Sequence, residues 1–333
     1  MADNRGILTV AELKDGAIAP ISYEELGIGR KLAKDTGQEL SAALLGGPGA
    51  GAKANDLIAH GADKVYVVEH DLLKDHASDA VISALKQVIE HAKPGIVMLG
   101  QTDAGREVAP KLAFRLKAGI CADCVELKAD PATKAVVATR SVYGGNARAD
   151  FIIESSPQVY TIRAKAFDKA ERQDGHQGKI EQVKVNLDPS VIKIKLIERK
   201  KAEAKGVRLE DADVVVSGGR GLGGPEHFKQ LEELAKLLKG AVGASRAVCD
   251  AGWMPPTMQV GLTGKVVSPS LYIAIAISGA SQHMAGCAGS KVIVAINKDA
   301  EANMFKEAQF GVVGDYLEVL PAFIDTVREL VGS

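Results

Sequence analysis

The chain has 333 residues, 46% of them apolar, which is enough for two domains with sizeable cores. Its formal net charge of −1 argues against nucleic acid or an anionic membrane as the main partner, because both favour a strongly basic surface. The longest apolar run, at 271–277, is far shorter than the ~20 residues of a membrane-spanning helix, and the first residues do not resemble a targeting peptide, so we expect a cytoplasmic protein.

The first half of the chain alternates apolar strand patterns with helical periodicity. Strands are expected at 6–13, 40–47, 64–70 and 95–100, and helices at 23–37, 54–61, 79–94 and 105–119. This alternation predicts a mostly parallel sheet with helices on both faces. From 125 to about 165 the pattern changes to short strands, with a turn at DPAT (130–133), and we expect these strands to extend the sheet in antiparallel fashion.

A charged segment with few large apolar residues, 167–208, separates the two halves. Within it, IERKKAEAKG (197–206) is the best candidate for a domain boundary. The β-α alternation then resumes, with strands expected at 212–219, 271–278, 291–297 and 311–316, and helices at 225–240, 280–287 and 318–331. We therefore predict two α/β domains, 1–200 and 207–333, each a mostly parallel sheet with flanking helices.

The four cysteines are too few for a disulfide scaffold in a chain of this length. Cys121 and Cys124 form a CxxC pair, but zinc would need two further ligands at suitable spacing, and none stands nearby. We interpret them as small buried or half-buried thiols, with a thioredoxin-like redox pair as the alternative. The histidines are scattered, and the sequence predicts no metal site.

Open parallel sheets bind ligands outside the carboxyl ends of their strands, so the strand-to-helix junctions are the candidate sites. The junction SGGRGLGGPEHF contains GxGxxG at Gly219, Gly221 and Gly224. An NAD-dependent oxidoreductase would need an acid about 20 residues on, where the chain instead reads AVGASRAV. We favour phosphate binding here, because the glycines expose N–H groups and Arg220 adds charge.

The junction LLGGPGAGAKAND (44–56) also looks like a phosphate loop. Pro48 removes one N–H group, and no Lys-Ser/Thr pair follows in the register of a P-loop. We interpret this junction as a structural glycine-rich loop without a ligand.

The junction LYIAIAISGASQHMAG (271–286) turns from an apolar strand directly to polar residues. Ser278 or Gly279 is expected to begin a short helix whose free N–H groups suit a phosphate, with His283 one turn into it. The alternative is that Ser278 only caps the helix and that His283 is a surface histidine. GASR (243–246) and QVGLTGK (259–265) are also flanked by glycines, and together these segments predict the lining of one polyphosphate cofactor.

The segment LYIAIAISGASQHMAGCAGSKVIVAIN (271–297) closely resembles the signature of electron transfer flavoprotein alpha subunits. VVVSGGRGL, AVGASRAVCDAG, MQVGLTGKVVSPSLY and GQTDAGREVAPKLAFRL are also similar to that family, so the resemblance spans the chain. It implies a Rossmann-like C-terminal domain that binds FAD, and a beta subunit that carries AMP, or a second FAD in bifurcating members that use NADH. The implied function is electron transfer from flavin dehydrogenases, such as acyl-CoA dehydrogenases, to a membrane quinone reductase.

The resemblance also implies roles for individual residues. Arg246 would lie against the isoalloxazine, the Thr263 hydroxyl near its N5, and His283 at its N1/C2=O edge. A donor and a cation placed there favour the negative charge that a reduced flavin develops. The other cofactor-binding positions that the resemblance implies are Arg220, Ser245, Val260, Gly261, Leu262, Ser278, Gly279, Ala280, Ser281, Gln282, Asn297, Asp315 and Tyr316.

Three residues depart from the family pattern. Leu262 stands where Gln is usual, Ser281 where Ile or Val is usual, and Ala276 where Gly is common. The first two change the polarity beside the implied flavin, so its potential is expected to differ from the family norm. The alternatives to a flavin carrier are an NAD-dependent oxidoreductase, which would use the Gly219–Gly224 loop, and a scaffold subunit without a cofactor.

Overall fold

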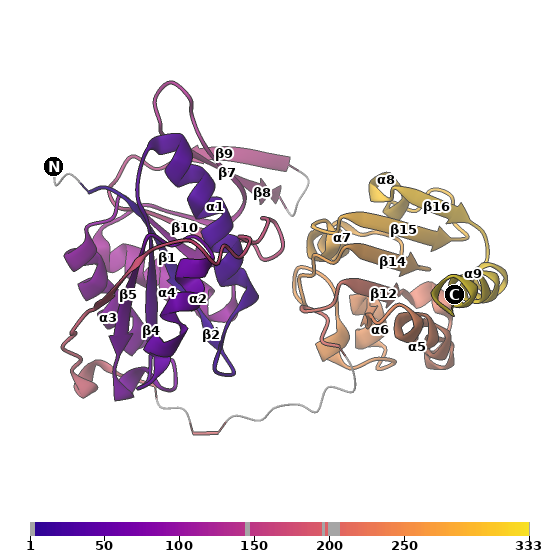
Figure 1. Ribbon diagram of the computed structural model, residues 1–333. Helices are drawn as coiled ribbons and strands as arrows, with labels where there is room; N and C mark the ends of the chain where they lie inside the picture. Colours follow the sequence, from indigo (N-terminus) through magenta and orange to yellow (C-terminus); the bar gives the residue numbers. More distant parts are fainter. Residues whose placement is uncertain (1–3, 144–146, 195–196, 199–206, 333) are drawn as a thin grey trace. The chain divides into compact units, whose positions relative to one another are not determined.

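The computed structural model describes residues 4–143, 147–194, 197–198 and 207–332. The chain divides into two compact units, one of Met1–Ser141 with Arg148–Lys200 and one of Val142–Ala147 with Lys201–Ser333. Each unit is built on one mostly parallel sheet with flanking helices (Figure 1), which confirms the predicted fold class. The predicted boundary stretch, 197–206, lies mostly outside the described residues.

The first unit contains a nine-stranded sheet in the order β11-β5-β4-β1-β6-β10-β7-β8-β9. Its strands are β1 (Ile7–Ala11), β4 (Leu40–Gly46), β5 (Lys64–Glu69), β6 (Ile96–Gly100), β7 (Ile120–Ala129), β8 (Val136–Val142), β9 (Ala147–Ile152), β10 (Gln158–Ile162) and β11 (Lys179–Gln182). A separate small hairpin joins β2 (Leu13–Lys14) to β3 (Ala17–Ile18).

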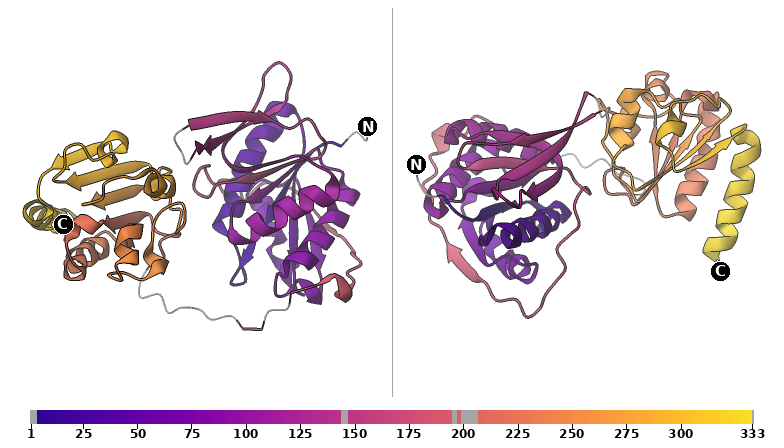
Figure 2. Two further views of the ribbon diagram at one scale, coloured as in Figure 1. Left: turned by 180° about the vertical axis from the view of Figure 1, so that it is seen from behind. Right: turned by 90° about the horizontal axis from the view of Figure 1, so that it is seen from above.

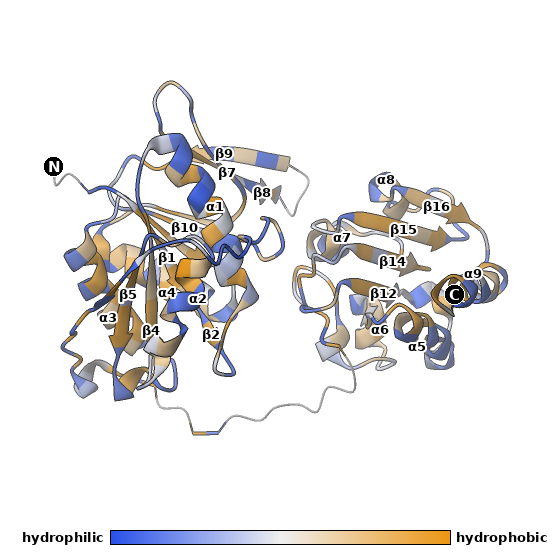
Figure 3. Ribbon diagram, in the orientation of Figure 1, coloured by the Kyte–Doolittle hydropathy of each residue, from blue (hydrophilic) through white to orange (hydrophobic). Residues whose placement is uncertain are grey.

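Helices cover both faces of this sheet (Figure 2). α1 (Pro20–Thr36) and α2 (Ala54–Ala59) share one apolar core with the strands, and α3 (Ser78–Ala92) and α4 (Asp103–Leu116) share the other. Successive residues of a strand point to opposite faces, so neighbours such as Ile7 and Leu8 belong to different cores. Figure 3 shows the result as apolar strands between helices with polar outer surfaces.

The antiparallel extension of the sheet is only partly as predicted. β7 and β8 are antiparallel, and the turn between them is held by Asp130, whose Oδ1 accepts from the backbone N–H groups of Ala132 and Thr133. β10, however, is parallel to both of its neighbours, β6 and β7. Its residues Val159–Ile162 are buried on both faces, as is typical of a central parallel strand. Sequence alternation cannot reveal the partner of such a strand.

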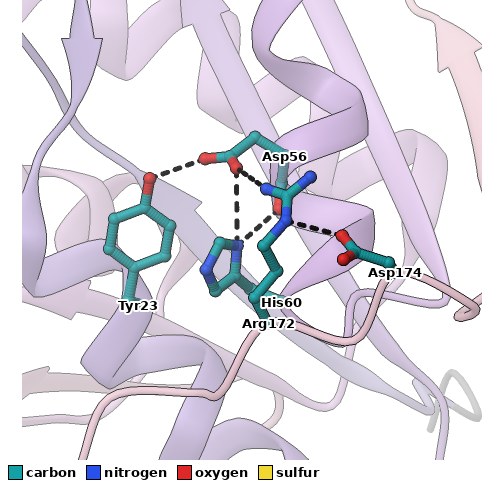
Figure 4. A network of polar contacts seen from close by, with 5 residues as sticks. All are labelled: Tyr23, Asp56, His60, Arg172 and Asp174. Atoms are coloured by element: carbon teal, nitrogen blue, oxygen red, sulfur yellow. Dashed lines mark hydrogen bonds and ion pairs between the residues drawn. The ribbon is translucent and has the colours of Figure 1, made fainter.

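Residues 167–182, the first part of the charged segment, belong to the first unit, cross α1 and α2, and end in β11, parallel to β5. Gly27 on α1 permits this crossing, because a Cβ atom there would lie 2.3 Å from the Asp168 carbonyl oxygen. Figure 4 shows how the segment is held: Asp56 on α2 accepts from the Tyr23 hydroxyl at 2.6 Å and pairs with Arg172 at 2.9 Å. Polar contacts hold this segment in place. Such contacts leave no periodic pattern of apolar residues, so the sequence does not predict where the segment lies.

The second unit contains five parallel strands in the order β13-β12-β14-β15-β16. They are β12 (Val214–Gly218), β13 (Ala241–Ala244), β14 (Leu271–Ile275), β15 (Val292–Asn297) and β16 (Phe310–Val313). α5 (Phe228–Leu237) and α9 (Tyr316–Gly332) pack on one face, while α7 (Ser281–Cys287) and α8 (Met304–Glu307) pack on the other. The strand order reverses between β12 and β14, and this reversal defines the switch point of the sheet.

Two carboxyl groups of α1 are buried in the first unit. Glu24 Oε2 accepts from the Lys165 N–H at 2.6 Å, and Glu25 Oε2 accepts from the Val10 N–H at 3.1 Å. Burial raises the pKa of Glu24 to about 7, although the backbone of Lys165 opposes the shift. Burial, together with the nearby Glu12, also raises the pKa of Glu25 well above its usual value.

We expect the first unit to lose stability as the pH rises. The pKa of Glu24 is about 7 in the folded state against 4.5 for an ordinary glutamate, so between these values the folded state keeps a proton that the unfolded state releases. The cost of ionising the buried group grows to roughly 3 kcal/mol by pH 7 and levels off at about pH 8. Glu24→Gln should therefore reduce the fall of the unfolding free energy between pH 5 and pH 8, measured in urea, while Glu25 keeps its own contribution to the slope.

The matched control for this measurement is Glu39→Gln, because Glu39 is exposed on the same unit. This variant should keep the slope of the wild type. An unchanged slope in Glu24→Gln would show that Glu24 ionises in the folded state as easily as in the unfolded chain.

Candidate functional site

The parallel strands of the second unit all end at one edge of the sheet, where open sheets of this class bind ligands. Most of the predicted site residues follow these strand ends directly. Arg220 lies after β12, Ser245 and Arg246 after β13, and Asp315 after β16. Asn297 is the last residue of β15. The predicted residues that follow β14 are Ser278, Gly279, Ala280, Ser281, Gln282 and His283.

The loop 259–265 reaches the same edge. Its Val260 N–H donates to the Ala244 carbonyl at 2.9 Å, next to the end of β13. Its Leu262 N–H donates to the Gln282 carbonyl on α7 at 2.7 Å. Gly286 allows this contact, since a Cβ atom there would lie 2.3 Å from the backbone nitrogen of Gly261. The structure thus brings the predicted residues Val260, Gly261, Leu262 and Thr263 beside α7.

α7 agrees within one residue with the helix expected at 280–287, but it does not begin at Ser278 or Gly279. Its first residue is Ser281 and its N-cap is Ala280. Gly279 has φ +79°, in the left-handed region, and a Cβ atom there would lie 2.3 Å from the Met304 backbone nitrogen. A turn at Gly279, packed against α8, therefore precedes the helix. The polar residues Ser278 and Ser281 alone do not indicate which of them lies in the turn and which in the helix.

His283 lies in the first turn of α7 and is buried, so the alternative of a surface histidine is wrong. Its Nε2 lies 2.8 Å from the hydroxyl of Tyr272 on β14. Its Nδ1 is buried and has no hydrogen-bond partner among the residues that the structure describes. Burial lowers the pKa of His283 to about 4, opposed by a contact with the Val260 backbone, so the ring is neutral at pH 7.

The neutral ring carries one hydrogen, and Tyr272 decides where it lies. Burial raises the pKa of the Tyr272 hydroxyl well above its usual value, so this group keeps its hydrogen. A buried hydroxyl needs an acceptor, and among the side chains beside it, which include Ser217 and Cys287, the imidazole Nε2 at 2.8 Å is the strongest acceptor. We therefore assign the ring hydrogen to Nδ1, the ring nitrogen that does not face Tyr272. The sequence pattern does not assign Tyr272 to the site. The available clue is that it is the one polar side chain in an otherwise aliphatic strand.

Several of the predicted site residues are exposed, Arg246 and Leu262 among them. Arg246 is the first residue of α6 (Arg246–Asp250), follows the N-cap Ser245, and pairs through Nε with Asp250 at 3.2 Å. Leu262 is 57% exposed. The Thr263 hydroxyl accepts from the Gln259 side-chain amide at 3.0 Å. Gln259 is a second residue that sequence reasoning did not assign, although it opens the QVGLTGK segment.

Asn297, Asp315 and Tyr316 line one pocket together with Gly221 and Leu222. The Asn297 side-chain amide donates to the Ile277 carbonyl at 3.0 Å. The Tyr316 hydroxyl donates to the Leu222 carbonyl at 2.6 Å, so its polar group holds the wall of the pocket. These three predicted residues are therefore neighbours, although they follow two different strands.

In the glycine motif after β12, packing requires a glycine at position 219 and leaves little room at position 221. A Cβ atom on Gly219 would lie 2.0 Å from the Ala276 carbonyl oxygen, and one on Gly221 would lie 3.1 Å from the Ala276 Cβ. Ala276 has φ +54°, in the left-handed region that costs an alanine roughly 1 kcal/mol, which explains why a glycine is common there. The loop and the segment after β14 thus touch at the switch point.

The glycine-rich loop of the first unit has a different structure. Gly49 and Gly51 both donate their N–H groups to Oε1 of Glu69, at 3.1 and 2.7 Å. A carboxylate of the chain itself therefore takes the place that a phosphate has in a P-loop.

The described residues contain neither a metal-binding cluster nor a helix that could span a membrane. They include no group of three or more His, Cys, Asp or Glu side chains placed to hold a metal ion. No helix in the part of the chain that the structure describes is long and apolar enough to cross a membrane.

Two family models match the chain. The electron transfer flavoprotein domain matches residues 7–188, and the electron transfer flavoprotein FAD-binding domain matches residues 208–288. The electron transfer flavoprotein subunit alpha of Megasphaera elsdenii is 42% identical over 335 residues, which cover 100% of this chain and 99% of that one. The subunit alpha of Bacillus subtilis is 39% identical, covering 97% of this chain and 98% of its own. Protein FixB of Azotobacter vinelandii is 36% identical, with coverage of 99% and 93%.

We expect Tyr272→Phe to remove the tautomer preference of His283. Without the hydroxyl, Nε2 loses its partner, so the Nδ1–H form is no longer selected, and leaving a buried acceptor unpaired should cost about 1–3 kcal/mol of stability. Nitrogen-15 NMR of histidine-labelled protein reads the tautomer directly. The control is Tyr160→Phe, which removes another buried hydroxyl, in the first unit, bonded to Gln158. An Nε2–H tautomer in the wild type would contradict the assignment.

Proposed function

Because the chain belongs to the electron transfer flavoprotein alpha subunit family, we propose that it carries FAD at the carboxyl edge of the second unit and serves there in electron transfer. The observation that carries this proposal is His283, a histidine buried at this edge whose Nδ1 makes no hydrogen bond of good geometry among the described residues, although the Val260 backbone lies beside the ring. A buried donor of this kind is costly unless a ligand pairs with it. The N1/C2=O edge of a flavin offers such acceptors.

The residues present at the edge fit the proposed cofactor. FAD, when bound, accepts electrons and passes them on. His283 would donate from Nδ1 and Arg246 would supply positive charge, both of which favour a negatively charged ring. The pocket beside Asn297, Asp315 and Tyr316 would take the AMP half. The other residues that would hold the cofactor are Arg220, Ser245, Val260, Gly261, Leu262, Thr263, Ser278, Gly279, Ala280, Ser281 and Gln282.

We further propose the partners that the family resemblance implies. A beta subunit with AMP, or with a second FAD in a bifurcating complex that uses NADH, would complete a heterodimer. Flavin dehydrogenases, such as acyl-CoA dehydrogenases, would supply electrons, and a membrane quinone reductase would accept them.

The proposed cofactor is tested by purifying the chain together with its beta subunit. We expect a yellow protein with flavin absorbance bands that releases FAD on denaturation. His283→Ala should weaken FAD retention or shift the flavin spectrum, because it removes the buried donor. A colourless complex that takes up NADH but no added FAD would contradict the proposal in favour of a nicotinamide site at Gly219–Gly224. A complex that binds neither would indicate a scaffold.

We expect Arg246 to tune the potential of the bound flavin. Its guanidinium stays charged at any working pH, and reduction adds negative charge to the ring. A tenfold change in a one-electron equilibrium corresponds to ~59 mV, and the pairing with Asp250 and solvent screening reduce the full effect of the charge. Arg246→Ala should therefore lower the first reduction potential by tens of millivolts. Arg246→Lys should lower it less, because the positive charge remains. Spectroelectrochemical titration measures both.

The control for Arg246 is Arg328→Ala, since Arg328 is an exposed, ion-paired arginine on α9 of the same unit. The first reduction potential of the flavin in Arg328→Ala should equal that in the wild type. Weaker FAD binding with an unchanged potential in Arg246→Ala would make Arg246 a phosphate ligand instead of a tuning residue.

A further inference from the structure

β7 contains a bulge that places Cys121 and Cys124 on the same face of the sheet. Cys121 lies opposite Tyr160 on β10, and Cys124 lies opposite Ile162, so three steps along β7 match two steps along β10. Residues three apart in a regular strand point to opposite faces. The extra residue of the bulge cancels this alternation, and both thiols belong to the apolar core beneath α1 and α2.

The bulge is fixed by specific contacts. Asp123, between the two cysteines, has φ +63° in the left-handed region. Its carboxylate makes a two-point ion pair with Arg163, with Nε–Oδ1 3.0 Å and Nη2–Oδ2 2.5 Å. The Asp123 N–H donates to the Thr161 hydroxyl at 2.8 Å, and the Arg163 N–H donates to the Cys124 carbonyl at 2.9 Å. The approach of the two cysteines is therefore part of the fold.

The two cysteines are neighbours on the bulge and differ in their surroundings. The Cys124 thiol donates to the Cys121 carbonyl oxygen at 3.3 Å and is fully buried. Cys121 forms part of the wall of a surface pocket, which Arg140 also lines. The Arg140 Nε is buried without a hydrogen-bond partner among the described residues. The hydrogen bond from Cys124 and the charge of Arg140 lower the pKa of Cys121 against the effect of burial, whereas the same hydrogen bond and burial raise the pKa of Cys124.

We propose that Cys121 and Cys124 are a redox-active dithiol that small peroxides convert to a reversible disulfide. The Cys121 thiolate attacks the peroxide oxygen, so an S–O bond forms and the O–O bond breaks, and the leaving oxygen takes a proton to become water or an alcohol. Cys124 Sγ then attacks the Cys121 sulfur, forms the S–S bond and releases water with its own proton. The two thiols thereby supply the two electrons that reduce the peroxide, and a dithiol reductant reverses the change.

The other two cysteines provide internal controls. Cys287 is fully buried on α7, and burial raises its pKa to about 12. Cys249 is half-buried, and burial and the nearby Asp250 raise its pKa. Neither has a second cysteine in contact among the described residues, so neither should form an intrachain disulfide.

The test treats the full chain with stoichiometric hydrogen peroxide, blocks the remaining thiols with N-ethylmaleimide and analyses the peptides by mass spectrometry. We expect the peptide with Cys121 and Cys124 to lose two hydrogens and to escape alkylation, with dithiothreitol restoring it. Cys124→Ser should instead accumulate a sulfenic acid on Cys121, which dimedone traps. Cys121→Ser should slow peroxide consumption at least tenfold, and Arg140→Gln should slow it severalfold.

Cys287→Ser should leave the rate and the disulfide unchanged. Oxidation of Cys249 or Cys287 before the pair, or an unchanged rate in Cys121→Ser, would overturn the proposal. Circular dichroism of each variant shows whether a slow rate reflects lost folding, and the Cys124→Ser adduct identifies the attacking sulfur without depending on a rate. These readouts do not involve the flavin, so they are independent of the proposed electron-transfer role.

Discussion

The second unit depends on one close approach, that of Gly219 to the carbonyl group of Ala276. This contact lies where the strand order reverses, between β12 and β14, and it brings the loop of the first strand against the segment that leads into α7. A side chain at Gly219 would separate the two segments. The Gly219–Gly224 loop, the turn at Gly279 and the start of α7 would then lose their common position. Gly219 of the GxGxxG motif is thus needed by the fold before any ligand is considered.

Much of the fold could be predicted because its pattern is local. The buried parallel strands are short apolar runs, and the amphipathic helices between them have a clear period. β10 and β11 could not be placed, since β10 gives no clue to its neighbours and β11 is a mostly exposed edge strand held by backbone pairing. The segment across α1 and α2 was missed for a related reason: Arg172, Asp56 and Tyr23 hold it by charge and hydrogen bonds, which have no period in the sequence.

The candidate site shows the same division. Resemblance to a family suggested which positions matter, and the parallel topology explains why distant segments such as 245–246 and 297–315 meet at one edge. The burial of His283 and its pairing with Tyr272 could not be foreseen, because the two residues are eleven positions apart on different elements. The turn before α7 could not be predicted, because it depends on the close packing of Gly279 against Met304, which belongs to another part of the chain.

In the glycine-rich loop of the first unit, a carboxylate of the chain itself competes with any dissolved anion for the backbone N–H groups. Glu69 is fixed at the end of β5 and presents its carboxylate to the N–H groups of Gly49 and Gly51. A group attached to the same scaffold acts at a high effective concentration, far above that of a free metabolite. Any dissolved anion would also meet the negative charge of Glu69 itself. The loop therefore has the shape of an anion-binding nest that is filled by the carboxylate of Glu69. A substitution that removes this carboxylate would leave the N–H groups of Gly49 and Gly51 free to bind another anion.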